Sequence, residues 1–178
     1  MGGRGRLIAM DVDAKKLEEL GRRARRAGLS NHRWISVGNE DQPFPLEVAP
    51  LIGKADRVLV DAPCSGLGTL RRNPDLKWRQ SPQSVDELTA KQAAILAAAA
   101  RMVRPGGRLV YATCSILAEE NEDIVNAFLA AHADFRRLSA QEVLAAQGIA
   151  IDCGEDMRLS PQKHGTDGFY AAVLERAK

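Results

Sequence analysis

The chain has 178 residues, of which 45% are hydrophobic and 27% charged, and its formal net charge is +2. This composition excludes a disordered or fibrous protein, and the length suffices for one domain with a core of its own. No window approaches the roughly 20 consecutive apolar residues of a membrane span, and the first residues lack the apolar core of a signal peptide. We therefore expect a cytoplasmic protein without a membrane partner.

Short apolar runs alternate with helical segments along the chain. In order, the pattern predicts a strand over 7–10, a helix over 14–27, strands over 34–37 and 57–60, helices over 84–103 and 119–132 with a strand over 108–112 between them, and closing strands over 157–159 and 169–174. The strands are apolar throughout, which indicates a parallel sheet covered by helices on both faces.

Polar residues follow three of these strands. Asp11, Asp61 and Cys114 each lie just past a strand end. Ligands of parallel sheets bind beyond the carboxyl ends of the strands, so we expect the three residues at one edge. A strand-end acid such as Asp11 either accepts hydrogen bonds from ribose hydroxyls or caps the next helix, although Asp13 is the better placed cap.

The three cysteines, Cys64, Cys114 and Cys153, are odd in number and form no CxxC pair, so neither a zinc site nor a thioredoxin-like centre is indicated. We interpret Cys153 as a small buried hydrophobic residue. Cys64 and Cys114 lie in loops at strand ends, the polar setting that a reactive thiolate needs. A Cys/His hydrolase is disfavoured, because His164 is the one histidine in a predicted loop.

Basic residues are clustered in two segments. The first, over residues 15–26, is interpreted as a solvated helix face. The second follows the Cys64 loop directly, has Trp78 among its charges, and comprises Arg71, Arg72, Lys77 and Arg79. A basic segment with an aromatic side chain suits a polyanion, RNA above all.

Three segments resemble signature motifs of a known family. They are DRVLVDAPCSGLGTLRRNPDLKWR (56–79), LVYATCSILAEEN (109–121) and SPQKHGTDGFYAAVLER (160–176). All three resemble the Sun/Nop family of RNA cytosine-5 methyltransferases. The resemblance implies an α/β, Rossmann-like methyltransferase fold that depends on S-adenosyl-L-methionine. It further implies a mostly parallel sheet with an antiparallel terminal strand, and one catalytic domain over 1–178.

The resemblance also implies a mechanism. Carbon 5 of cytosine is a poor nucleophile, and addition of a thiolate to carbon 6 activates it. The family's motifs assign this nucleophile to Cys114, release of the product to Cys64 and contact with the target base to Asp61. The RNA substrate is expected to be ribosomal, and its cytosine would be turned out of the stack.

S-adenosylmethionine is the cofactor that the resemblance implies. The implied contacts are Asp11, Val12, Asn39, Asp61 and Pro63. Asn39 departs from the family, which usually has an acid there. The opening residues 1–6 resemble the region just after the family's glycine-rich cofactor motif. We therefore expect the first strand, its cofactor loop and its lysine to be missing, and cofactor binding and methylation to be impaired.

Two functions stay open at this point. The first is RNA cytosine-5 methylation, and the second is a non-catalytic relative that binds RNA or another partner. Methyl transfer to protein or DNA is disfavoured. Amino-nitrogen methyltransferases usually have an NPPY-like tetrapeptide after the strand that corresponds to 57–60, where this chain has DAPC (61–64). No metal is expected, and the sequence does not indicate the oligomeric state.

Overall fold

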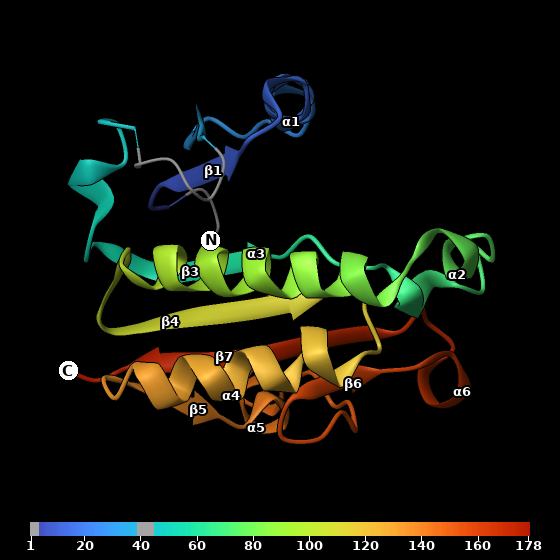
Figure 1. Ribbon diagram of the computed structural model, residues 1–178. Helices are drawn as coiled ribbons and strands as arrows, with labels where there is room; N and C mark the ends of the chain where they lie inside the picture. The colour runs from blue at the N-terminus through green and yellow to red at the C-terminus, as the bar shows by residue number, and fades with distance from the viewer. Residues whose placement is uncertain (1–3, 39–44) are drawn as a thin grey trace. The chain divides into compact units, whose positions relative to one another are not determined.

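The computed structural model describes residues 4–38 and 45–178. The chain divides into two compact units, Met1–Leu51 and Ile52–Lys178 (Figure 1). Within the described residues, no helix combines the length and apolarity needed to cross a membrane. The expected single domain over 1–178 stays a prediction.

The first unit contains a β-α-β segment. Strand β1 (Leu7–Asp11) pairs in parallel with β2 (His32–Ser36), and helix α1 (Ala14–Arg26) connects them; a short 3₁₀ helix, η1 (Ala49–Leu51), follows. The Asp13 Oδ1 accepts a hydrogen bond of 2.9 Å from the Lys15 N–H and so caps α1 as expected. The register pairs Asp11 with Ser36, so both strands of this unit end together.

The second unit is built on a mixed sheet in the order β3-β4-β7-β5, with β6 also paired to β7. Figure 1 shows α3 running along β3 and β4, and α4 lying over β5 and β7. In chain order its elements are β3 (Ala55–Asp61), η2 (Leu67–Thr69), α2 (Leu76–Arg79), α3 (Pro82–Ala100), β4 (Val103–Thr113), η3 (Ala118–Glu120), α4 (Glu122–Ala131), β5 (Phe135–Leu138), α5 (Ala140–Ala145), β6 (Met157–Leu159), α6 (Pro161–His164) and β7 (Phe169–Arg176).

The core of this unit lies between β4 and the helices. Leu109 on β4, Leu174 on β7, Leu96 on α3 and Val125 on α4 are all fully buried. Burial of each such side chain contributes about 1.5–3 kcal/mol. The sheet is therefore held rigidly under the loops that leave its edge.

The strand register brings three loops to one edge of the sheet. β3 and β4 are parallel, with Asp61 opposite Ala112, so both strands end at the same level. β7 is antiparallel to β4 and pairs Tyr170 with Thr113, so β7 begins where β4 ends. The segments after β3, after β4 and before β7 therefore meet there.

Most predicted elements are present with shifted ends. Helix α3 begins at Pro82, before the predicted start, because Ser81 caps it and Ser84 completes the capping box. Strand β4 begins at Val103 and includes the Pro-Gly-Gly segment (105–107), around which its register against β3 shifts. The α/β class, the parallel pairs and the antiparallel terminal strand are confirmed.

Candidate active site

The two strand-end cysteines lie together. The Sγ atoms of Cys64 and Cys114 are 3.4 Å apart, a hydrogen-bonding distance for thiols, and both residues are half-buried. Cys64 belongs to the loop after β3 and Cys114 to the loop after β4. β3 and β4 are parallel neighbours whose ends lie at the same height in the sheet. The two loops therefore leave the sheet side by side.

The contact gives the two sulfurs different acidities. The hydrogen bond with Cys64 lowers the pKa of Cys114 to about 7, against the opposing effects of burial and of the Asp61 and Glu120 carboxylates. The same hydrogen bond, followed by burial, raises the pKa of Cys64 well above its ordinary value. Of the two thiols, Cys114 is therefore the one that ionises near neutral pH, while the proton stays on Cys64.

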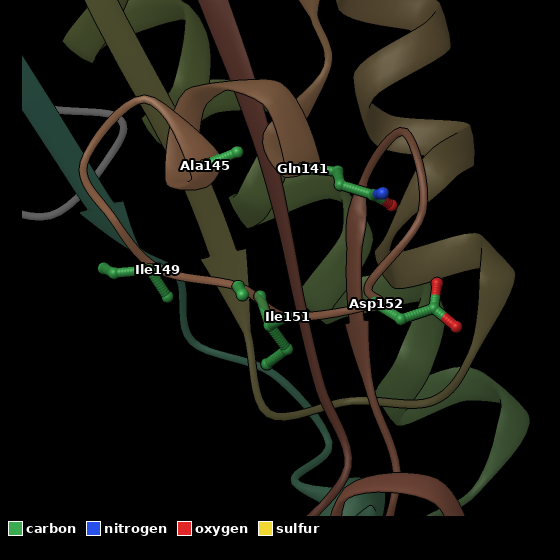
Figure 2. Close-up of a pocket in the computed structure, with 6 residues that line it drawn as sticks. Gln141, Ala145, Ile149, Ile151 and Asp152 are labelled. Carbon is green, nitrogen blue, oxygen red and sulfur yellow. The ribbon is translucent and has the colours of Figure 1, made fainter.

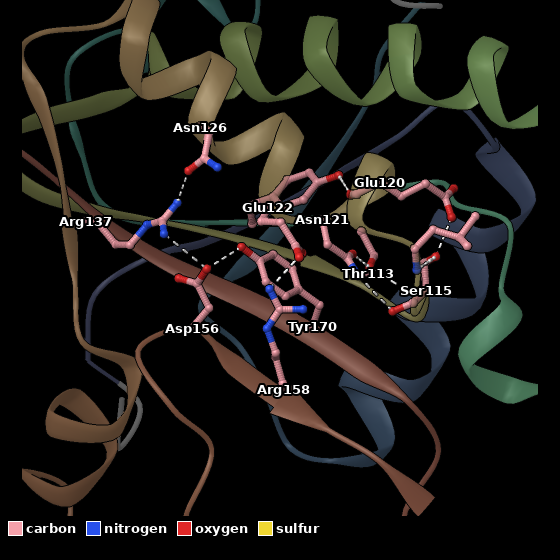
Figure 3. A network of polar contacts seen from close by, with 12 residues as sticks. Thr113, Ser115, Glu120, Asn121, Glu122, Asn126, Arg137, Asp156, Arg158 and Tyr170 are labelled. Carbon is pink, nitrogen blue, oxygen red and sulfur yellow. Dashed lines mark hydrogen bonds and ion pairs between the residues drawn. The ribbon is translucent and has the colours of Figure 1, made fainter.

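A buried carboxylate connects the two cysteine loops. The Glu120 Oε1 accepts hydrogen bonds from the Ser65 N–H at 2.7 Å and from the Gln92 Nε2 at 3.1 Å. Its Oε2 accepts from the Ser65 hydroxyl at 2.5 Å and from the Ser115 hydroxyl. Figure 3 shows Glu120 beside Ser115, at one end of a longer row of polar contacts.

The segment before β7 packs on the same loops. The Gly68 N–H donates to the Cys114 carbonyl oxygen at 2.9 Å, and the Gly168 N–H donates to the Gly68 carbonyl oxygen at 2.8 Å. A Cβ on Gly68 would lie 2.2 Å from the Gly168 oxygen, so a side chain does not fit there. The GTDGF segment (165–169) therefore lies against the cysteine loops.

The predicted cofactor contacts fall in both units. Asp61 and Pro63 are exposed at the end of β3. Asp11 ends β1 of the other unit, where its Oδ1 accepts a 2.8 Å hydrogen bond from the Asp13 N–H, and Val12 is exposed. Asn39 lies outside the described residues.

The predicted RNA-binding residues are all exposed. Both Arg71 and Arg72 form ion pairs with Asp167, and Arg79 pairs with Asp75 at 2.7 Å. The ammonium group of Lys77 lies 4.9 Å from the ring centroid of Trp78, whose side chain is 81% exposed. The Gln80 Nε2 donates to the Ser65 carbonyl oxygen at 3.0 Å, which fastens this segment to the Cys64 loop.

A family model described as 16S rRNA methyltransferase RsmB/F matches residues 1–175. The chain belongs to this family. The family resemblance of the three motifs is thereby confirmed.

Individual relatives of the RsmB/F family agree. The chain is 40% identical over 178 residues to the probable ribosomal RNA small subunit methyltransferase B of Synechocystis, covering 99% of this chain and 39% of that protein. The ribosomal RNA small subunit methyltransferase B of Shewanella oneidensis is 39% identical, with 97% and 38% covered. The chain therefore spans about two fifths of the length of these relatives.

The fold agrees with a solved structure, NSun6 from Pyrococcus horikoshii with SFG. The similarity covers 99% of this chain and 42% of that chain, with 27% identity and a TM-score of 0.73. The expected Rossmann-like methyltransferase fold is confirmed by this match.

Sequence reasoning missed the residues that fix the loops of this RsmB/F chain. Glu120 reads as one of two acids at a helix start, and Ser65 and Ser115 read as ordinary loop residues. The available signal was Gln92, a polar residue on the otherwise apolar face of α3. It is fully buried, and its Nε2 also donates to the Pro63 carbonyl oxygen at 2.9 Å.

Three other features have no part in this site. In His164, Nδ1 accepts from the Ser160 N–H and Nε2 donates to the Asp152 carbonyl oxygen, so neither nitrogen is free to act as a base for a thiol. An open pocket at α5, drawn in Figure 2, contains none of the predicted site residues and is lined by Gln141, Ala145, Ile149, Ala150, Ile151 and Asp152. Cys153 is buried in a small apolar cluster, as expected.

Proposed function

We propose that this chain is the catalytic part of an enzyme that methylates carbon 5 of a cytosine in small-subunit ribosomal RNA, with S-adenosyl-L-methionine as methyl donor. The observation that carries the proposal is the 3.4 Å contact between Cys64 and Cys114. One thiol at this sheet edge has a lowered pKa and the other a raised pKa. Such a pair suits a reaction in which one sulfur bonds covalently to the substrate and must later be released.

The first step uses the thiolate. Cys114 adds to carbon 6 of cytosine, and the electron pair of the 5,6 double bond becomes available at carbon 5. Asp61 contacts the base in this step, as its motif implies. S-adenosylmethionine supplies, when bound, an electrophilic methyl group for carbon 5. The depressed pKa of Cys114 raises the fraction of thiolate available near neutral pH.

The second step reverses the addition. Loss of the carbon-5 proton restores the 5,6 double bond, and the bond between carbon 6 and sulfur breaks. We assign the base to Cys64. The largest cause of its raised pKa is the hydrogen bond to Cys114, which disappears once Cys114 is a thioether. The pKa of Cys64 then falls, and its thiolate form can accept the proton on carbon 5.

The cofactor fits the residues of each unit. Asp11 ends β1 of a parallel β-α-β segment, and an acid at that place accepts hydrogen bonds from ribose hydroxyls. Asp61 and Pro63 are exposed at the end of β3. The solved NSun6 contains an analogue of S-adenosylmethionine (SFG), which supports the same cofactor here.

The RNA partner is supported by the exposed basic segment. Arg71, Arg72, Lys77 and Arg79 follow the Cys64 loop, and such a segment suits phosphates next to the reacting base. The names of the relatives support small-subunit ribosomal RNA as the substrate.

The test is methylation of small-subunit ribosomal RNA by the chain with isotopically labelled S-adenosylmethionine, followed by nucleoside analysis. We expect 5-methylcytidine as the labelled product. Label in N4-methylcytidine or in another base would overturn the proposal. RNA binding without methylation, together with no heat in a calorimetric titration at millimolar cofactor, would favour a non-catalytic RNA-binding module; the same titration tests the impairment expected from the sequence.

A further inference from the structure

The Glu120 carboxylate is fully buried, yet the site described above gives it no chemical step. A buried carboxylate costs several kcal/mol unless hydrogen bonds replace its water. Here four uncharged donors do so, two on each oxygen. Such charge-assisted bonds are stronger than neutral ones, so the group holds its partners firmly.

The donors come from the segments that carry the reacting sulfurs. Ser65 directly follows Cys64, and Ser115 directly follows Cys114. The Ser65 and Ser115 hydroxyl oxygens meet on Glu120 Oε2 and lie 3.3 Å from each other. One carboxylate oxygen therefore connects the neighbours of both cysteines.

Glu120 is itself fixed on two sides. Its carbonyl oxygen accepts a 2.7 Å hydrogen bond from the Tyr111 hydroxyl, which ties η3 to β4. The Gln92 Nε2 reaches from α3 to Glu120 Oε1 and to the Pro63 carbonyl oxygen. The carboxylate thus anchors both cysteine loops to β4 and α3, which belong to the packed core of the unit.

We propose that Glu120 is a positioning residue that sets the separation of the Cys64 and Cys114 sulfurs. The sulfurs hydrogen-bond at 3.4 Å only while both loops keep their places. A displacement of about 1 Å would break this contact, and misplacement on that scale costs a reaction up to ~100-fold. The consequence for methylation rests on the function proposed above, whereas the spacing itself does not.

Two variants of Glu120 separate the effect of the loop spacing from the effect of the carboxylate charge. In Glu120→Gln the amide oxygen still accepts from the Ser65 N–H and Gln92, and the amide N–H groups donate to the two serine hydroxyls, which rotate to accept. This variant keeps the spacing and loses the charge. Glu120→Asp keeps the charge, but its side chain is one methylene too short to reach both loops. Glu119→Gln, at the exposed neighbour, is the matched control.

The test measures thiol proximity directly. Cys153 is replaced by alanine in the full chain, and Cys64 and Cys114 are cross-linked with dibromobimane, which becomes fluorescent when two nearby thiolates displace both bromides. We expect rates at least as high as the parent's in Glu119→Gln and Glu120→Gln. We expect a rate lower by about tenfold or more in Glu120→Asp and Glu120→Ala. Equal rates in all five proteins, with folding verified by near-UV circular dichroism, would overturn the proposal.

A second readout and a milder variant complete the test. The pH dependence of Cys114 alkylation should move to higher pH in Glu120→Asp, because the hydrogen bond from Cys64 is lost, and should not move upward in Glu120→Gln. If the Glu120 variants do not fold, Ser115→Ala removes the donor to Glu120 beside Cys114, together with the acceptor of the Leu117 N–H, and must slow cross-linking; an unchanged rate overturns the proposal. Neither readout needs RNA or cofactor, so this proposal and the proposed methylation can fail separately.

Discussion

The backbone N–H of Gly168 donates a hydrogen bond to the carbonyl oxygen of Gly68, at 2.8 Å, and joins the segment before β7 to the loop of Cys64. Gly68 in turn donates to the Cys114 carbonyl oxygen at 2.9 Å. The three segments at the sheet edge are therefore in direct backbone contact, which leaves no room for a side chain on Gly68.

Gly68→Ala should destabilise the second unit and abolish methylation. The added Cβ would lie 2.2 Å from the Gly168 oxygen and 2.7 Å from the Cys114 oxygen, so the backbone must move. We expect a loss of about 3 kcal/mol in the free energy of unfolding. Urea unfolding measures it. The control is Gly148→Ala, where φ is 76° but nothing lies within 4 Å, and which should cost only the backbone strain of about 1 kcal/mol. Equal losses in both variants would contradict the close contact.

The acidity of Cys114 should depend on Cys64. In the parent protein the rate of iodoacetamide alkylation at Cys114 should rise with pH around an apparent pKa of about 7. Removal of the thiol in Cys64→Ala deletes the largest cause of that lowering, so the pKa should rise towards its ordinary value of about 8.5. The rate is measured by mass spectrometry of the Cys114 peptide. An unchanged profile in Cys64→Ala would mean that another group lowers the pKa.

The place of the cysteines could be predicted from sequence because strand ends are simple to recognise. An apolar run that stops at Asp61, and another that stops at Thr113, mark the edge of a parallel sheet, and the fold brings such edges together. This register accounts for the two cysteine loops lying side by side, whereas the 3.4 Å separation of the sulfurs also depends on contacts within the loops. Glu120 was not predicted, because its partners lie in two loops and on α3. These contacts between distant parts of the sequence leave no periodic pattern in it.

Other elements were missed for a related reason. Strand β5 (Phe135–Leu138) contains two arginines and lacks the apolar run used to predict strands. It is recognisable only by its pairing with β7, which is a contact between distant parts of the sequence. Helix α5 (Ala140–Ala145) is too short for a periodic pattern and depends on its Ser139 cap and on packing against β7.

The two cysteines should give opposite phenotypes with RNA. Cys114→Ala removes the nucleophile, so no covalent RNA–protein adduct and no methylation are expected. Cys64→Ala leaves the nucleophile and removes the group assigned to product release, so an adduct should accumulate and appear as a shifted band on a denaturing gel. An adduct formed by Cys114→Ala would show that the two roles are exchanged.

The basic segment should contribute to RNA affinity through phosphates. If Lys77 and Arg79 each neutralise one phosphate, the double alanine variant should bind single-stranded RNA more weakly and lower the slope of log K against log salt by about 1.4 in magnitude. The matched control is the double alanine variant of Arg22 and Arg23 on α1, whose guanidinium groups pair with Glu19 on a solvated helix face. Filter binding over a series of salt concentrations measures both slopes. A lower slope for the control and an unchanged slope for the Lys77 and Arg79 variant would place the RNA contact at the basic cluster on α1. RNA would then not approach over the Cys64 loop.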